Sequence, residues 1–491
     1  MLFNSINFIY FFVIVTTLYF TLPHRFRWFL LLMSSCYFYM SFVPVYILIL
    51  GFTIIVDYFA GILIENSQGL KRKKFLIASL IANIGVLVFF KYYNFINDNL
   101  TFMLYGVGFT NPIPYLSIIL PIGLSFHTFQ AMSYTIEVYR GRHPAEKHFG
   151  IYALYVMFYP QLVAGPIERP QNMLHQFHEK HTFNIDHLTE GLKMMLWGFF
   201  KKVVIADRLA LYVDPIYNNP QSYTGSTFIL ATIFFAFQIY CDFSGYSDIA
   251  IGSARVMGFN LMRNFNFPFR AKSVSEFWAR WHISLSTWLR DYIYLPLILY
   301  FSRRMKKPKY SFWSKETYIY SIATIITFLI SGIWHGAAWT FVILGALHGF
   351  YLVFAILTKN KRKKFNQLIG LDKLPKLYNA IQIIITFALV NIGFLFFRSK
   401  DVDTAWQILS AMFSDPFSKL YPGESQWITL ISILLILLLI ILEILQTKGY
   451  ISSYFSKSGF SRPLRWAGYI ALLLMICILG VGGDRFIYFQ F

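Results

Sequence analysis

The sequence predicts an all-α, polytopic integral membrane protein, and two features of its composition carry that prediction. Of its 491 residues, 57% are hydrophobic and only 13% are charged, and the mean hydropathy is +0.53. A soluble domain needs about 25% charged residues to cover its surface. Because a spanning helix takes about 20 apolar residues, this composition suffices for about 10 to 13 spanning helices, with further re-entrant or interfacial pieces. A soluble enzyme, a disulfide scaffold and a disordered chain are excluded.

The basic residues predict the topology. The chain carries 43 Lys and Arg against 23 Asp and Glu, a formal net charge of +20. In a soluble protein this excess would suggest nucleic acid, whereas in a membrane protein basic residues gather in cytoplasmic loops. We therefore expect the protein to be embedded in the lipid bilayer and to bind no nucleic acid. The dense basic clusters lie at 71–74, 303–309 and 359–364.

The first five spans alternate consistently across the membrane. The uncharged N-terminal stretch lacks both a basic flank ahead of it and a cleavage site, so it predicts a retained helix with the N-terminus outside. Three crossings then end at cluster 71–74 on the inside, and two more lead to Arg140 and Arg142, again inside. The expected spans cover about residues 1–20, 26–44, 46–64, 75–93 and 115–138.

The remaining segments predict broken helices, a hairpin and three final spans. Prolines, lysines and glycines interrupt the apolar segments near 148–165, 190–206 and 226–258, so broken, tilted or re-entrant helices are expected there. Apolar runs at 317–334 and 338–357 lie between two basic clusters and predict a hairpin. The final spans are expected near 380–397, 428–446 and 466–482; the loop 452–465 should face inside and the C-terminus outside.

The sequence contains no internal repeat, and it contains no linker that would split off a soluble domain. The chain is therefore predicted to form one transmembrane domain over residues 1–491. Within it we distinguish N-terminal helices at 1–140, a catalytic core at 141–357 and C-terminal helices at 358–491.

A stretch at 276–292 combines an apolar face with polar residues. Read as a helix, it places Trp278, Trp281, His282, Leu285 and Trp288 on one side. An interfacial amphipathic helix with Trp anchors explains most of this pattern. It does not explain His282 in the middle of the apolar face, which is either a hydrogen-bonded packing residue or a catalytic group.

His335 stands at the turn of the predicted hairpin, some 20 residues from basic residues on either side. At 1.5 Å per residue this is on the order of 30 Å, most of the bilayer thickness. Gly332 and Gly336 flank it and permit a bend and close approach of a substrate. An imidazole there can act as general base toward a hydroxyl. A buried structural histidine, or a gate residue of a transporter, is the competing interpretation.

Other polar clusters are weaker candidates. His175, His178, His181 and His187 crowd one segment, but it is rich in charge and predicts a solvated surface more than a zinc site. No metal site is expected. Intramembrane acids could form a proton relay but are more often partners between helices; they are Asp57, Glu137, Asp242 and Asp248. Cys36, Cys241 and Cys477 lack CxxC spacing and are expected to be small hydrophobes.

Six motifs are spread over nearly the whole length of the chain. They are Pro121–Phe126, Val163–Arg169, residues 238–252 with the Asp-Phe-Ser-Gly-Tyr sequence, Asn264–Asp291, Trp334-His335-Gly336 and the ending Phe486–Phe489. In these motifs and in their order the chain resembles the membrane-bound O-acyltransferase (MBOAT) family, and within it the bacterial alginate O-acetyltransferase (AlgI-like) branch.

This resemblance implies an acyltransferase fold around a central membrane tunnel. It implies that His335 is the essential residue near the middle of the tunnel and that His282 is a second histidine near its donor side. Donor-binding or tunnel-lining roles are implied for Asn266, Trp281, Arg290, Asp291, Trp334 and Asp242. His127 departs from the family's pattern, in which an aromatic residue such as Tyr is expected.

The resemblance also implies the reaction. Acetyl groups would come from a cytoplasmic thioester, acetyl-CoA or an acylated carrier, with no bound cofactor. They would pass across the bacterial inner membrane to an extracytoplasmic polysaccharide or peptidoglycan. An exported SGNH-type acetyltransferase, AlgJ- or AlgX-like, is the implied partner. The alternatives are a transporter or flippase for a glycan or lipid intermediate, although the two related halves typical of transporters are not found, and a structural subunit of an export complex.

Overall fold

The computed structural model describes residues 1–117, 120–163, 165–310, 313–448, 461–482 and 486–487. Helices make up nearly all of its regular structure, and the described strands form one short antiparallel hairpin of β1 (Lys309–Tyr310) and β2 (Trp313–Ser314). The all-α prediction is confirmed. Part of the predicted inside loop, 452–460, and the motif residues Tyr488 and Phe489 lie outside the described residues.

The chain packs as two compact units. The first comprises Met1–Met195 and Tyr246–Arg263. Its helices are α1 (Ile6–Thr21), α2 (His24–Met40), η1 (Pro44–Tyr46), α3 (Ile47–Glu65), α4 (Gly69–Leu87), η2 (Val88–Tyr92), α5 (Tyr93–Gly106), α6 (Leu124–Tyr139), α7 (Phe149–Met157), α8 (Tyr159–Leu162) and α9 (Pro170–His178). Two helices, α10 (Ile185–Phe199) and α12 (Gly225–Val256), contribute residues to both units.

The second unit comprises Leu196–Gly245 and Asn264–Phe491. Our division of a single domain at residues 140 and 357 stays a prediction. The helices of this unit are η3 (Phe200–Ala206), α11 (Asp207–Asn218), η4 (Pro220–Ser222), η5 (Pro268–Arg270), α13 (Val274–Arg280), α14 (Ile283–Leu289), η6 (Arg290–Tyr294), α15 (Leu295–Arg304), α16 (Lys315–His335), α17 (Trp339–Leu357), α18 (Lys359–Leu368), η7 (Leu371–Lys373), α19 (Pro375–Arg398), α20 (Val402–Ser414), α21 (Gln426–Thr447) and α23 (Ser461–Leu479).

Eight helices of the described part are long and apolar enough to cross a membrane. They confirm the expected spans from residue 46 onward except at 115–138, where the helix α6 begins only at Leu124. The first expected span is the 16-residue helix α1, which is apolar but shorter. The eight helices are Pro44–Glu65, Gly69–Gly106, Gly225–Val256, Lys315–His335, Trp339–Leu357, Pro375–Arg398, Gln426–Thr447 and Arg462–Leu479.

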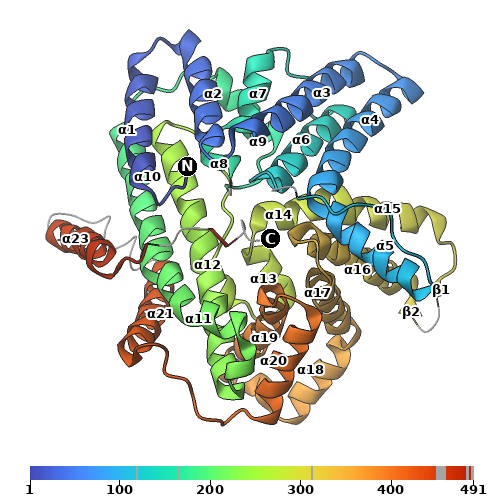
Figure 1. Cartoon of the computed structure of the whole chain (residues 1–491), viewed down its shortest axis with the longest axis vertical. Coiled ribbons are helices and arrows are strands. Elements are labelled where there is room, and N and C mark those ends of the chain that lie inside the picture. Colours follow the sequence, from blue (N-terminus) through green and yellow to red (C-terminus); the bar gives the residue numbers. More distant parts are fainter. Residues whose placement is uncertain (118–119, 164, 311–312, 449–460, 483–485, 488–491) are drawn as a thin grey trace. The chain divides into compact units, whose positions relative to one another are not determined.

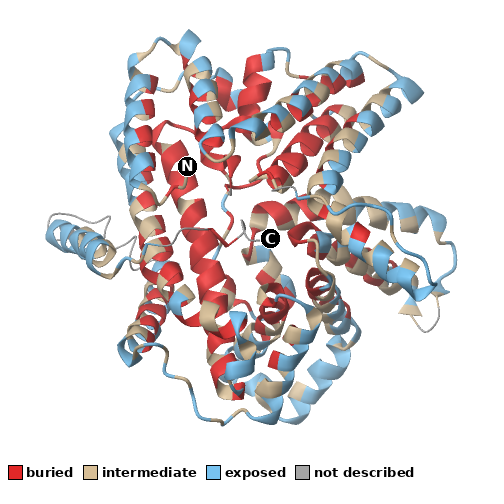
Figure 2. Cartoon of the chain, in the orientation of Figure 1, coloured by how far each residue is buried: buried red, intermediate tan, exposed pale blue. Residues whose placement is uncertain are grey.

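Large apolar side chains remain exposed along these spans. Leu48, Ile81 and Leu434 each leave more than half of their surface uncovered by protein, and Figure 2 shows exposed residues along the outer faces of α3, α4 and α21. Such faces would be costly in water, because apolar surface is driven out of it. They mark the lipid-facing sides of a multi-pass membrane protein. By contrast, α12 is buried along most of its length.

A buried carboxylate joins α3 to α4 within the first unit. Asp57, which is fully buried, accepts hydrogen bonds from the Ser79 hydroxyl (2.6 Å) and the Asn83 amide (2.9 Å). Buried polar groups persist when their hydrogen-bonding capacity is met within the protein. Asp57 is therefore a partner between helices, as the simpler of our two interpretations predicted.

The glycines of segment 226–258 do not break it. This stretch forms the continuous 32-residue helix α12, so our expectation of a broken or re-entrant segment there was wrong. Gly245 lies against Gly198 and Gly252 against Gly191, where an added Cβ would come within 2.7 Å and 2.6 Å of the facing carbonyl oxygens. The small residues let α10 and α12 approach closely, as is common between membrane helices. By contrast, the expected interruption near 190–206 is present, because α10 passes into the π-helical turn η3.

Candidate active site

The hairpin of α16 and α17 places His335 at its turn, as predicted. His335 is the last residue of α16, and Trp339 begins α17 four residues later (Figure 1). The Ser314 side chain caps the start of α16 by accepting from the Thr317 N–H, with Glu316 in the first turn. The helix between this cap and His335 is 21 residues long. The imidazole is 7% exposed and lies against the rings of Trp334 and Phe397, with ring centroids 5.0 and 5.6 Å away.

The glycines beside His335 serve the packing of the two helices. A Cβ on Gly332 would come within 2.2 Å of the Phe341 carbonyl oxygen, and one on Gly336 within 2.0 Å of the Phe341 ring. The expected bend is present directly after His335, and the expected close approach of a substrate stays a prediction. Because these glycines have no side chain, the turn and His335 can pack closely against α17.

His282 lies at a sharp break between two short helices. The expected continuous helix over 276–292 was wrong, because α13 ends at Arg280 and α14 begins at Ile283. Between them Trp281 is extended, and His282 adopts a left-handed conformation with φ 42° and ψ 54°. Such a conformation is uncommon outside glycine and costs on the order of 1–3 kcal/mol, so surrounding structure must hold it.

Two asparagines hold this break through hydrogen bonds. The carbonyl of Asn264 accepts from the Ile283 N–H (2.9 Å), and its side-chain oxygen accepts from the Ser284 hydroxyl (2.6 Å). Asn266 donates its N–H to the carbonyl of Arg280 (2.9 Å). Because lipid cannot hydrogen-bond irregular backbone, these partners are what make the break tolerable within a membrane protein. Asn266, a predicted tunnel residue, thus acts here through its backbone, and its side chain is exposed.

Hydrogen bonds of Ser273 and Glu276 cap the start of α13, the short helix before the break. The Ser273 hydroxyl accepts from the Glu276 N–H (3.1 Å), and the Glu276 carboxylate in turn accepts from the Lys272 N–H (2.9 Å) and the Arg280 guanidinium (2.7 Å). Burial raises the pKa of Glu276, but these two donors outweigh it and leave the pKa below its usual range. The carboxylate therefore stays charged and keeps Arg280 beside Asn266.

Aromatic contacts bring the two histidines into one cluster. The fully buried His282 lies 4.6 Å from the ring of Phe243 on α12 and 6.0 Å from Trp334, measured between centroids. Trp334 also contacts His335. Two predicted residues 53 positions apart in the chain thus share one tryptophan. Phe243 and Asn264 were missed as single positions, although both stand in the motifs that we had marked.

The other predicted residues lie at varying depth around this cluster. Trp281 is buried and packs against Phe265, Phe277 and Phe394, with centroids 5.0–5.4 Å away. Arg290 and Asp291 form an ion pair (2.8 Å) in the π-helical turn η6, where their side chains are 58% and 31% exposed. Arg290 and Asp291 are thus accessible to solvent, whereas Trp281 is part of an aromatic core. Their donor-binding and tunnel-lining roles stay predictions.

Asp242 joins a buried charge cluster. The Lys202 ammonium lies 2.5 Å from Asp242 and 2.7 Å from Asp207, and all three side chains are at least nine-tenths buried. Asp242 also accepts the Ile487 N–H at 2.8 Å. Lys202 was seen in the sequence only as an interruption of an apolar run. A lysine within such a run is itself a functional signal, since it needs a partner.

The remaining histidines form no metal site. His175 faces Glu179, His178 faces Glu146, and a ring nitrogen of His181 lies 2.9 Å from the Gln176 carbonyl oxygen. Within the described ranges, no three His, Cys, Asp or Glu side chains are arranged to hold a metal ion. A further buried imidazole, His348 on α17, was overlooked; it accepts a hydrogen bond from the Trp278 indole (3.2 Å) and is explained by packing.

Known proteins match this chain over most of its length. The family model of MBOAT, the membrane-bound O-acyltransferase family, matches residues 147–399, which is more than half of the chain. This stretch contains His282, Trp334 and His335. The chain is a membrane-bound O-acyltransferase. It belongs to the AlgI-like branch, because it is 37% identical to the probable alginate O-acetylase AlgI of Pseudomonas aeruginosa over 419 residues, 84% of this chain and 75% of that protein.

Two further relatives show how far the similarity reaches. The peptidoglycan O-acetyltransferase of Helicobacter pylori is 33% identical over 78% of this chain and 73% of its own length. The teichoic acid D-alanyltransferase of Streptococcus thermophilus is 31% identical over 56% of this chain and 68% of its own length. This O-acyltransferase is thus an enzyme of membrane acyl transfer, and the nucleic-acid, transporter and purely structural interpretations are set aside.

Two substitutions of His282 should distinguish the effect of its backbone conformation on stability from the effect of its imidazole on acyl transfer. Alanine in the left-handed region is strained by about 1–2 kcal/mol, whereas glycine is not. We expect His282→Gly to be the more stable of the two variants, and both to lose at least about tenfold in acyl transfer because both lack the imidazole. Unfolding in detergent and transfer rates measure the two effects. Wild-type transfer by His282→Gly would assign His282 to backbone geometry alone.

Proposed function

We propose that this O-acyltransferase takes acetyl groups from a cytoplasmic thioester and delivers them to a hydroxyl group on the far side of the bacterial inner membrane. The acceptor is an alginate-like polysaccharide or peptidoglycan, reached with an exported SGNH-type acetyltransferase as partner. Relatives named for O-acetylation of alginate and of peptidoglycan match more of the chain than those named for D-alanyl transfer, which favours acetyl. The observation that carries the proposal is the buried histidine pair joined by Trp334.

In this mechanism His335 acts as the general base. Its imidazole accepts the proton of the acceptor hydroxyl while that oxygen attacks the thioester carbonyl. The carbon–sulfur bond then breaks, and the leaving thiolate takes up the proton. Trp334 and Phe397 surround the imidazole and exclude water, which would otherwise hydrolyse the donor. A thioester is already activated, so the reaction needs no metal and no covalently bound cofactor.

His282 and the residues around it serve the donor side. The break at His282 presents the imidazole toward Trp334, and Trp281 shapes the wall beside it. Asn266, Arg290 and Asp291 stand toward the donor-side opening, where Arg290 would meet phosphate groups of acetyl-CoA or of an acylated carrier.

The basic clusters give this transfer its direction. We assign 71–74, 303–309 and 359–364 to the cytoplasmic face by the positive-inside rule, with both termini outside. Their charge would also attract an anionic donor to the cytoplasmic opening, an effect that salt screens.

Proteoliposomes test the proposal. Purified enzyme supplied with labelled acetyl-CoA or acetylated carrier on one side, and with the exported partner and glycan on the other, should consume thioester and form acetyl ester in equal amounts. The rate should fall as salt rises, because the donor is anionic. Glycan that crosses the bilayer while the thioester stays intact would identify a transporter and overturn the proposal.

A further inference from the structure

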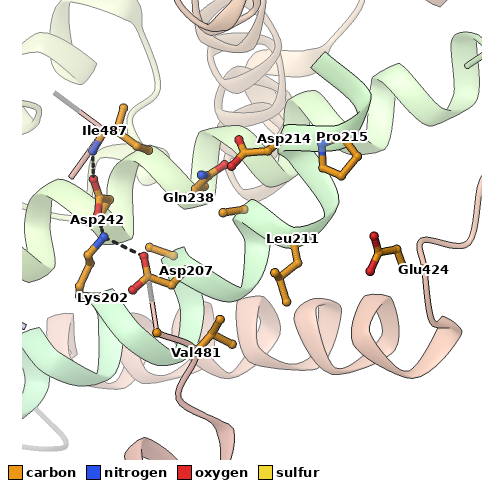
Figure 3. A pocket seen from close by; sticks show the side chains of 13 residues that line it. Lys202, Asp207, Leu211, Asp214, Pro215, Gln238, Asp242, Glu424, Val481 and Ile487 are labelled. Carbon is orange, nitrogen blue, oxygen red and sulfur yellow. Dashed lines mark hydrogen bonds and ion pairs between the residues drawn. The ribbon is translucent and has the colours of Figure 1, made fainter. Parts of the chain in front are cut away.

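A pocket of about 400 Å³ lies in the second unit beside the charge cluster. Residues of η3, α11 and α12 line it together with Glu424, just before α21, and Val481, just after α23. Figure 3 shows these side chains around it. Pockets for small molecules range from roughly 300 to 1,000 Å³. The space thus suits a small ligand such as a single sugar unit rather than a coenzyme the size of CoA.

Gln238 points to a polar ligand in this pocket. Its side chain lines the pocket and is 5% exposed, and its carbonyl oxygen has no hydrogen-bond partner among the residues that the structure describes. A buried amide is normally satisfied, and one left open costs stability. Asp242 stands one helical turn further along α12 and lines the same pocket. The two side chains together offer acceptors for the hydroxyls of a ligand.

The charge of the lining selects against anions. Four carboxylates line the pocket, those of Asp207, Asp214, Asp242 and Glu424, against one ammonium, that of Lys202. Lys202 already pairs with Asp207 and Asp242. Outside the lining, Arg398 pairs with Asp214 at 2.8 Å. Carboxylates still outnumber the cations, so an acidic sugar or a phosphate would be repelled while neutral hydroxyls can donate to the carboxylates.

The pocket also has a defined position along the membrane helices. It lies near the end of α19, marked by the Arg398–Asp214 pair, near the start of α21 and beyond the end of α23. In the proposed topology all three places face away from the cytoplasm. The next residue of α12, Phe243, contacts His282. Consecutive residues of α12, Asp242 and Phe243, thus border the pocket and the proposed site.

From the open amide of Gln238, the excess of carboxylates and the volume, we propose that this pocket binds a neutral, polyhydroxylated sugar unit of the acceptor. The proposal rests on the proposed acetyl transfer, and of the acceptors named there it favours one built of neutral sugar units over an alginate-like polyuronate. Hydroxyls of the sugar would donate to Asp242 and Glu424 and to the side-chain oxygen of Gln238. A uronate unit would be disfavoured by its own charge.

Saturation-transfer NMR on the full chain in nanodiscs tests this assignment with three probes: cellobiose, N,N′-diacetylchitobiose and a mannuronate disaccharide. We expect at least one neutral disaccharide to bind, and the uronate to bind about tenfold more weakly or not at all. Gln238→Leu should weaken neutral-sugar binding about tenfold. Because its carbonyl oxygen has no partner to lose, this variant should unfold at a temperature no lower than that of the wild type.

Gln161→Leu provides the matched control, because its amide donates to the Tyr155 carbonyl in the first unit at 2.5 Å and does not line the pocket. It should lose stability and keep sugar binding. Lack of binding by both neutral disaccharides, uronate binding as tight as theirs, or unchanged neutral-sugar binding by Gln238→Leu would overturn the assignment. Hydrolysis of the thioester donor to water, measured on the same samples, tests the proposed function separately, since it needs no sugar.

Discussion

His335→Ala should abolish acyl transfer while leaving the fold intact. The imidazole contacts Trp334 and Phe397 at the end of α16, and Gly332 and Gly336 pack the α16–α17 turn closely against Phe341. Loss of a positioned general base typically costs about 10²–10⁴-fold in rate. We expect a loss in this range for transfer from a labelled thioester in proteoliposomes, with little change in the unfolding temperature.

His175→Ala is the matched control for this substitution, because its side chain is 56% exposed on α9 and lies in the first unit. It should transfer acyl groups at the wild-type rate. His335→Gln should be as inactive as His335→Ala, since glutamine can hydrogen-bond but cannot take up the proton. Transfer by purified His335→Ala at the wild-type rate would refute the assignment of the general base.

Lys202→Met should produce the largest loss of stability among the charge substitutions. Lys202 is the shared partner of two buried carboxylates, Asp207 and Asp242. Removing it leaves two buried acids without that cation, and breaking a buried pair costs about 3–5 kcal/mol. Asp242→Asn should cost less, because Lys202 then keeps Asp207 as its partner. Equilibrium unfolding in mixed detergent micelles measures both changes.

Lys363→Met controls for the loss of one positive charge, since this lysine is exposed on α18. It should leave the unfolding free energy unchanged. The order of stability is the informative result: Asp242→Asn less stable than Lys202→Met would contradict the view that one lysine balances two acids.

Hydropathy and charge predicted the α16–α17 hairpin and the position of His335 well. Both depend on sums over neighbouring residues, which a linear sequence contains in full. The break at His282 was missed for the opposite reason. Side-chain periodicity over 276–292 fits a helix. The residues at the break instead donate hydrogen bonds to Asn264 and accept one from Asn266, and both asparagines lie outside that window.

Glycine illustrates the same limit in α12 and in the hairpin. Gly245 and Gly252 suggested a broken helix, and Gly332 and Gly336 suggested a bend and the close approach of a substrate. In the structure each instead faces a close neighbour: Gly198, Gly191 or Phe341. A glycine permits a bend and a close approach equally. Only the arrangement of the neighbouring helix decides which of the two is used.

The sequence by itself determined that this is a multi-pass helical membrane protein, that His282 and His335 stand in motifs that resemble those of the family, and that it is a membrane-bound O-acyltransferase. The transfer of apolar side chains out of water is additive along the chain, so composition and spacing suffice for the first of these. The tertiary structure alone decided that Trp334 links the two histidines, that Lys202 balances Asp207 and Asp242, and that Gln238 opens into a pocket. Such polar and aromatic contacts act over a few ångströms between distant residues, so only the folded chain reveals them.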